Sequence, residues 1–351
     1  MTPGGGQTLR IGVSVDLSTP AGADFAQEAE RLGAHSAWTA ETWGYDALTP
    51  LAYLAAQTTT MRLGSGVAQV GTRTPAMLAM SAMSLQALSG GRFILGLGVS
   101  GPQVMEGWHG VRFSSPVART RETIDIIKMI TRGDRLVYDG STYTLPLPDG
   151  AGRPIRSAAP PVDVPVWVAA LGPRNLHMTG EVADGWMGQT VIPETASTFI
   201  DHISSGAAAA GRSLADLTLS AMVSVEIGHD VEAVAKRHAR GYAFTIGAMG
   251  SADQNFYKDA FGRQGFEDAV DEVQALWRAG KREEAGDRVP VELAVRTNLL
   301  GTEPLIAERL RAYRAAGFTL LRAAIVGAGT TDRLDALAAL LDVVGRVNRE
   351  T

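Results

Sequence analysis

The sequence of 351 residues contains no cysteine. A chain without thiols forms no disulfide, iron–sulfur cluster or thiolate zinc site, and it has no cysteine nucleophile. Histidine is also scarce, and four of the six histidines show no ligand-like spacing to carboxylates: His177, His202, His229 and His238. We therefore expect no metal site.

Long apolar runs and an excess of basic residues are also missing. No segment approaches the roughly 18 apolar residues that cross a bilayer. The opening MTPGGGQ has neither the basic nor the apolar stretch of a secretory signal. The formal net charge is −5 at pH 7, so we expect no basic surface that would attract nucleic acid or an anionic membrane. We expect a cytoplasmic protein with no nucleic-acid or membrane partner, and residues 1–8 are predicted to be a flexible leader.

Strand and helix patterns alternate along residues 9–351. Hydrophobic residues make up 45% of the chain and charged residues 20%, which allows a large core. Helical signals separate the apolar runs, such as Pro75 at the start of one segment and Gly90 at its end. This alternation predicts one α/β domain, a (β/α)₈ TIM barrel with insertion segments. The expected strands are residues 9–17, 35–40, 62–67, 92–97, 164–170, 185–188, 217–227 and 320–326.

Two segments interrupt the alternation. Residues 134–163 contain the string YDG and several prolines, which predicts a hairpin-like excursion. Residues 231–289 are expected to be mostly helical, with a break near residues 250–262. Each interruption is open to two interpretations, a lid over the barrel mouth or a surface loop.

The string GLGVSG at residues 96–101 has the GxGxxG spacing of a dinucleotide-binding loop. That loop requires a helix to begin at its third glycine, whereas Pro102 follows here and we expect no helix before about Val117. A glycine-rich strand end, where bare backbone admits a flat ligand, is the better interpretation. The string RLGSGV at residues 62–67 is either a strand packed on its helix or a bulge pressed against a planar ring.

Four strings resemble motifs of one known superfamily, in order and in spacing. They are AWTAETW at 37–43, LGSGVAQ at 63–69, GLGVSGPQVMEGWHG at 96–110 and ALGPRNLHMTGEVADGW at 170–186. They are similar to motifs of the luciferase-like monooxygenases, and within that superfamily to the branch that uses the deazaflavin coenzyme F420. The resemblance extends over about residues 9–347.

This resemblance implies a (β/α)₈ barrel that holds a phosphate-bearing deazaflavin or flavin at its C-terminal mouth. It implies a non-prolyl cis peptide at Gly66–Val67, whose bulge would lie behind the middle ring of the cofactor. It also implies that the helix beginning at Gly172 receives the phosphate, since helix N-termini favour anions. The expected cofactor-binding residues are Gly66, Val67, Ser100, Gly101, Gly172, Pro173, Arg174 and Gln189.

Three titratable side chains in the motifs are candidates for proton transfer. Glu41 is placed first because it follows a barrel strand, which holds a catalytic group rigidly. His109 and Glu106 lie in the loop after the fourth strand. Family members often have histidine after the acid, whereas this chain has Thr42, and some carry a glutamate where Ser100-Gly101-Pro102 stands. Three nearby aromatic residues would be walls of a substrate pocket or lids on the core: Trp43, Tyr45 and Trp108.

The function that follows is hydride transfer between coenzyme F420 and a small organic substrate. The alternative is an FMN-dependent luciferase-like monooxygenase, and a third, non-enzymatic interpretation is a flavin-binding barrel without chemistry. The expected partners are a small-molecule substrate and a second copy of the chain in a homodimer.

Overall fold

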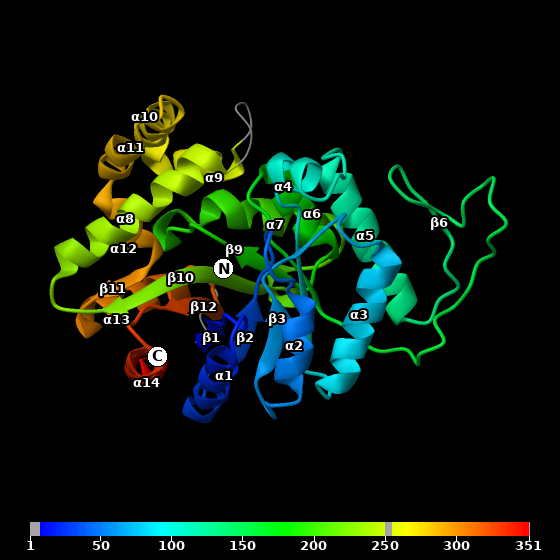
Figure 1. The fold of residues 1–351 in the computed structure, drawn as a ribbon, viewed down its shortest axis with the longest axis horizontal. Helices are drawn as coiled ribbons and strands as arrows, with labels where there is room; N and C mark the ends of the chain where they lie inside the picture. Colours follow the sequence, from blue (N-terminus) through cyan, green and yellow to red (C-terminus); the bar gives the residue numbers. More distant parts are fainter. Residues whose placement is uncertain (1–7, 250–254, 351) are drawn as a thin grey trace.

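The computed structural model describes residues 8–249 and 255–350, so residues 1–7 of the expected leader lie outside the described part. Eight parallel strands close into a barrel, because β12 pairs with both β1 and β10, and β10 also pairs with β9. The predicted (β/α)₈ fold is confirmed (Figure 1). The barrel strands are β1 (Arg10–Ser14), β2 (Ser36–Thr39), β3 (Arg62–Ser65), β5 (Phe93–Gly98), β8 (Val166–Val168), β9 (Gly185–Gly188), β10 (Thr218–Ile227) and β12 (Leu320–Ile325).

Two short strands add to this sheet. β4 (Ala68–Gln69) follows β3 after a break at Gly66 and Val67, and it pairs with the end of β5. β11 (Leu299–Gly301) pairs with residues 225–227 of β10, beyond the part of β10 that pairs with β9. β11 is not among the strands expected from the sequence. It forms because β10 is ten residues long and extends past its neighbour β9.

Helices surround the barrel and cover the outward faces of the strands. The helices between strands β1 and β9 are α1 (Pro20–Leu32), α2 (Leu48–Ala55), α3 (Pro75–Leu88), α4 (Pro102–Gly107), α5 (Pro116–Thr131) and α6 (Pro173–Val182). Those that follow β9 are α7 (Ser197–Ala209), α8 (Val231–Ala248), α9 (Phe256–Phe261), α10 (Glu267–Arg278), α11 (Arg282–Arg288), α12 (Val291–Thr297), α13 (Glu303–Ala315) and α14 (Thr330–Arg349). Among the described helices, none is long and apolar enough to cross a bilayer.

The excursion at residues 134–163 contains the predicted hairpin, made of β6 (Tyr138–Asp139) and β7 (Thr144–Leu145). It connects the end of α5 to the start of β8, so it leaves the barrel at the end opposite the mouth. Glu122 of α5 accepts backbone N–H groups from residues 141–143 and holds the hairpin turn against that helix. Figure 1 shows the rest of the loop standing away from the barrel, which makes it a surface feature and not a lid.

The second interruption is only partly described. Residues 250–254 lie outside the described part, whereas 256–261 form α9 and 262–266 form a wide helical turn. The expected break over 250–262 is therefore wrong for its second half. Asn255 begins α9 by accepting the backbone N–H groups of Tyr257 and Lys258.

Two tryptophans fill the barrel interior. The rings of Trp38 on β2 and Trp167 on β8 lie 5.3 Å apart, and Met187 on β9 packs in the same cluster. Gly64 is required opposite Trp38, because a side-chain carbon there would overlap the indole ring. The glycine-rich strands that the sequence shows thus make room for large side chains contributed by other strands.

Candidate active site

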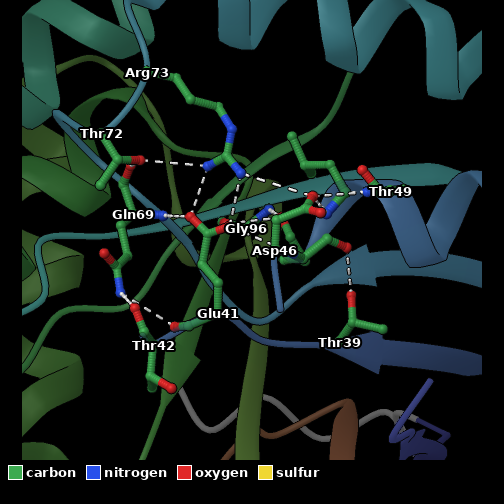
Figure 2. Close-up of polar contacts among 12 residues, drawn as sticks. Thr39, Glu41, Thr42, Asp46, Thr49, Gln69, Thr72, Arg73 and Gly96 are labelled. Carbon is green, nitrogen blue, oxygen red and sulfur yellow. Dashed lines mark hydrogen bonds and ion pairs between the residues drawn. The ribbon is translucent and has the colours of Figure 1, made fainter. Parts of the chain in front are cut away.

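A buried carboxylate lies where β2 ends. The Glu41 side chain is 8% exposed, and its Oε1 accepts hydrogen bonds from the Gln69 backbone N–H and from Arg73 Nη1, both at 2.7 Å. Its Oε2 accepts from Arg73 Nη2 at 2.9 Å and from the Ala47 backbone N–H at 3.1 Å. Figure 2 shows the guanidinium above this carboxylate. Four donors occupy the two oxygens, an arrangement suited to a carboxylate anion.

Through Arg73, Glu41 connects the loop after β2 to the segment between β4 and α3. Arg73 belongs to the segment between β4 and α3, and its Nη2 also lies 3.8 Å from Asp46 in the loop before α2. The hydrogen bonds that Arg73 donates to Glu41 raise the pKa of Arg73 above its ordinary value. The Gln69 side-chain amide donates to the Thr42 carbonyl at 3.1 Å. This bond fixes the backbone at Thr42, the position where family members often have histidine.

The peptide bond between Gly66 and Val67 is cis, as the resemblance implies. The backbone on both sides of it is hydrogen-bonded to the end of β2 and to the second residue beyond it: Gly66 N–H donates to the Thr39 carbonyl at 2.6 Å, and Glu41 N–H donates to the Val67 carbonyl at 3.3 Å. Val67 packs against the apolar cluster around Trp38 in the barrel interior. Residues 62–67 therefore form a strand that is interrupted at the cis bond, and the planar ring against which the bulge would press stays a prediction.

The end of β5 differs from expectation. Ser100 has a φ of 58°, and the six-residue helix α4 begins directly after Gly101. The expectation of no helix before about Val117 is therefore wrong, because Pro102 supplies a φ suited to a first helical turn. Residues 96–101 are not the loop of a dinucleotide-binding fold, because that fold has an open sheet and β5 lies within a closed barrel.

The remaining titratable candidates lie at the surface. Glu106 and His109, on α4 and just after it, are exposed, and Glu106 accepts the Phe113 backbone N–H at 3.0 Å. They stand on a different loop from the buried Glu41. The three aromatic residues considered with them are also exposed, at 53%, 72% and 65%, so they are not lids on the core: Trp43, Tyr45 and Trp108.

The N-terminus of α6 presents free backbone N–H groups and two arginines. Gly172 is the N-cap residue, Pro173 is the first helical residue and Arg174 is exposed. Arg263 donates from Nη2 to the carbonyl of Leu171 at 2.7 Å, which places a second guanidinium beside this helix start. Arg263 is not among the residues expected from the sequence, because it lies 92 residues from Leu171 in the chain. The expected ligand Gln189 is half-buried directly after β9.

A cavity of about 370 Å³ lies between α8 and the ends of β10 and β12. Its size is within the range of small-molecule pockets. His238 Nε2 lies 2.8 Å from Glu226 Oε2 at this cavity, and the two side chains are 15% and 18% exposed. The sequence gives His238 no role, because only the packing of α8 over the end of β10 brings it to Glu226. The lining residues are Ser224, Glu226, Arg237, His238, Gly241, Tyr242, Thr245 and Val326.

A closed parallel barrel with polar groups gathered at the carboxyl ends of its strands defines an enzyme of the TIM-barrel class. The model of the luciferase-like monooxygenase family matches residues 10–320, so the chain belongs to that family. A Mycobacterium tuberculosis protein assigned as a coenzyme F420-dependent oxidoreductase is 38% identical over 328 residues, which cover 91% of this chain and 94% of that protein. The chain is thus an oxidoreductase of this family, and the resemblance stated from its motifs is confirmed.

Solved structures share the fold. The F420-dependent tetrahydromethanopterin reductase of Methanopyrus kandleri has a TM-score of 0.75 at 21% identity, covering 95% of this chain and 97% of that one. An F420-dependent secondary alcohol dehydrogenase with an F420–acetone adduct has a TM-score of 0.76 at 16% identity, covering 96% and 99%. A Baeyer–Villiger monooxygenase from Pseudomonas putida in complex with FMN has 0.67 at 17%, covering 97% and 98%. At these identities the likeness shows the fold alone.

Proposed function

We propose that this protein transfers a hydride between coenzyme F420 and a small organic substrate. The observation that carries the proposal is the start of α6, where the exposed Arg174 and Arg263 lie beside the helix N-terminus, an arrangement that suits an anion. Such a site suits the phosphate of a flavin or deazaflavin. The 38% identical relative, which is assigned as F420-dependent, favours the deazaflavin.

The residues present fit this cofactor. In the proposal, Gly172, Pro173 and Arg174 hold the phosphate together with Arg263, while Gly66 and Val67 form the wall behind the ring. Ser100, Gly101 and Gln189 contribute to the same mouth. When bound, the deazaflavin supplies or accepts the hydride, and the protein supplies orientation, exclusion of water and a proton route.

The cavity at the ends of β10 and β12 is the proposed substrate site. Hydride transfer to or from a carbon bonded to oxygen or nitrogen requires a proton to move at the heteroatom. In the proposal, His238 exchanges this proton and Glu226 orients its imidazole through the 2.8 Å contact. This assignment joins the earlier candidates Glu41, His109 and Glu106. The four donors around Glu41 favour a positioning role for that carboxylate.

Cofactor titration tests the proposal. Purified protein is mixed separately with F420 and with FMN, and binding is followed by the change in cofactor fluorescence. Reduced and oxidised F420 are then supplied with a panel of ketones, imines and secondary alcohols, and hydride transfer is read from the visible absorption of the oxidised ring. Binding of F420 with turnover of at least one substrate supports the proposal, and binding of neither cofactor contradicts it.

An FMN-dependent monooxygenase is the second candidate function. The start of α6 would accept the phosphate of FMN equally well, and the FMN-bound Baeyer–Villiger enzyme shares the fold. Tight binding of FMN with oxygen-dependent product formation, and no binding of F420, would select this alternative. A cytoplasmic location and a homodimer remain predictions that fractionation and sedimentation would test.

A further inference from the structure

One arginine lies inside the barrel. Arg322 is the third residue of β12, and it is 4% exposed. Its Nη2 donates to the carbonyl of Gly188, at the end of β9, over 2.9 Å. Within residues 8–249 and 255–350 it forms no ion pair, and its buried Nε has no hydrogen-bond partner. Burial lowers the pKa of Arg322 to about 10, so the guanidinium is still charged at neutral pH.

The guanidinium reaches across the barrel to the bulge. Its central carbon lies 5.7 Å from the centroid of the Trp38 ring. Its Nη1 lies 3.6 Å from the point that a side-chain carbon on Gly66 would occupy. Gly66 and Gly188 both stand at the carboxyl ends of their strands. The guanidinium of Arg322 therefore lies inside the barrel at the carboxyl ends of the strands, next to Gly66, which is proposed to lie behind the cofactor ring.

A buried charge without a counterion destabilises a fold unless something compensates it. Arg92 is a useful comparison, because its guanidinium is fully hydrogen-bonded within the protein. It lies just before β5, and its three nitrogens donate five hydrogen bonds, four to carbonyls and one to a hydroxyl. Arg322, by contrast, donates one hydrogen bond within the protein, to the Gly188 carbonyl. The missing acceptors point to a ligand that brings its own.

We propose that Arg322 binds the pyrimidinedione edge of the ring cofactor, the edge that carries two carbonyl oxygens and the nitrogens between and beside them. A planar guanidinium can donate to a carbonyl oxygen of this edge and to the unprotonated ring nitrogen beside it, whereas the N–H between the two carbonyls is itself a donor. Hydride addition elsewhere on the ring leaves negative charge on this edge, so the contact strengthens when the cofactor is reduced. The inference rests on the proposed function. F420 and FMN share this edge, so it holds for whichever of them binds.

Two substitutions of Arg322 test this role. Arg322→Met removes the charge and the donors, and Arg322→Lys keeps the charge. We expect Arg322→Met to raise the Kd for oxidised F420 at least about tenfold, the scale of a charged hydrogen bond, and the Kd for reduced F420 more. The midpoint potential of the bound cofactor should fall accordingly. Arg322→Lys should recover part of both losses. The same titrations with FMN show which cofactor the edge contact serves.

Thermal stability separates a ligand role from a structural one. Because Arg322→Met removes an uncompensated buried charge, the ligand-free variant should melt at or above the wild-type Tm. The matched control, Arg92→Met, should melt lower and bind cofactor within about twofold of the wild type, since it lies at the opposite end of the barrel.

Three results would overturn the inference: a Kd for Arg322→Met within twofold of the wild type, a Tm as low as that of Arg92→Met, or failure of Arg322→Met to fold. Wild-type protein that binds neither cofactor contradicts the proposed function itself. Wild-type binding that Arg322→Met leaves unchanged contradicts only the role of Arg322.

Discussion

Glu41 and Arg73 face each other in a two-point ion pair, with Oε1–Nη1 at 2.7 Å and Oε2–Nη2 at 2.9 Å, although 32 residues separate them in the chain. The pair connects the loop after β2 to the segment before α3, and these two loops flank the Gly66–Val67 bulge. A carboxylate in this arrangement fixes the two loops relative to each other. Whether it also moves a proton is open to a direct test.

Glu41→Gln should slow turnover by more than about tenfold, which corresponds to roughly 1.4 kcal/mol on the barrier. If positioning through Arg73 is the cause, Arg73→Met should slow turnover by a similar factor, and the double variant should be little worse than either single one. The measurement is kcat and Tm for the three variants. A Glu41→Gln enzyme far slower than Arg73→Met, with a shifted pH profile, would instead identify Glu41 as the proton carrier. His109→Ala should have a smaller effect.

Charge reversal at the α6 anion site should weaken cofactor binding. Arg174→Glu and Arg263→Glu are each expected to cost about 1–3 kcal/mol of binding free energy, the scale of a charged hydrogen bond. Fluorescence titration with F420 measures the loss. Arg156→Glu makes the same charge change on the exposed excursion and should leave the Kd unaltered. Unchanged affinity in both α6-site variants would move the phosphate elsewhere.

The His238–Glu226 pair makes a separate prediction about the proton. His238→Asn and Glu226→Gln should lower kcat about 10²-fold or more, at the lower end of general acid–base contributions, while the Kd for F420 stays within about twofold. The pH profile of kcat should lose one limb in His238→Asn. Full activity of His238→Asn across the pH range would return the assignment to Glu41, His109 or solvent.

His35 makes the stability of the fold depend on pH. Burial, and then the positive charges of Arg10 and Arg62, lower its pKa from 6.5 to about 4. Between pH 6.5 and about pH 4, His35 is therefore protonated in the unfolded chain and neutral in the folded one. The free energy of unfolding falls as the pH drops through this range.

The loss should be on the order of 1–2 kcal/mol, because partial exposure of His35 reduces it. Tm measured between pH 7.5 and pH 4.5 should fall less in His35→Gln than in the wild type. His229→Gln, at an exposed site, should behave like the wild type. Equal slopes for the wild type and His35→Gln would show that His35 is not the cause.

Local sequence patterns determined the elements of this fold. Pro75 begins α3 as predicted, and the short apolar run at Gly185–Gly188 is a strand with the expected bounds. Apolar strands separated by capped helices are encoded within windows of ten to twenty residues, and a repeated strand–helix unit has few closed arrangements. The barrel could therefore be predicted, as could the family from four motifs at strand ends.

Tertiary structure alone decided what several of the polar residues do. β11 exists because residues 299–301 meet the far end of β10, which no local window contains. Glu41 looked like a free acid at a strand end until Arg73 was brought to it, and His238 looked isolated until α8 packed over Glu226. Arg322 reads as one charged residue in an apolar strand, and only barrel closure shows that it points inward without a partner. Hydrogen bonding and burial depend on which distant groups arrive within about 3 Å, and that is settled by the fold and not by the neighbouring residues in the chain.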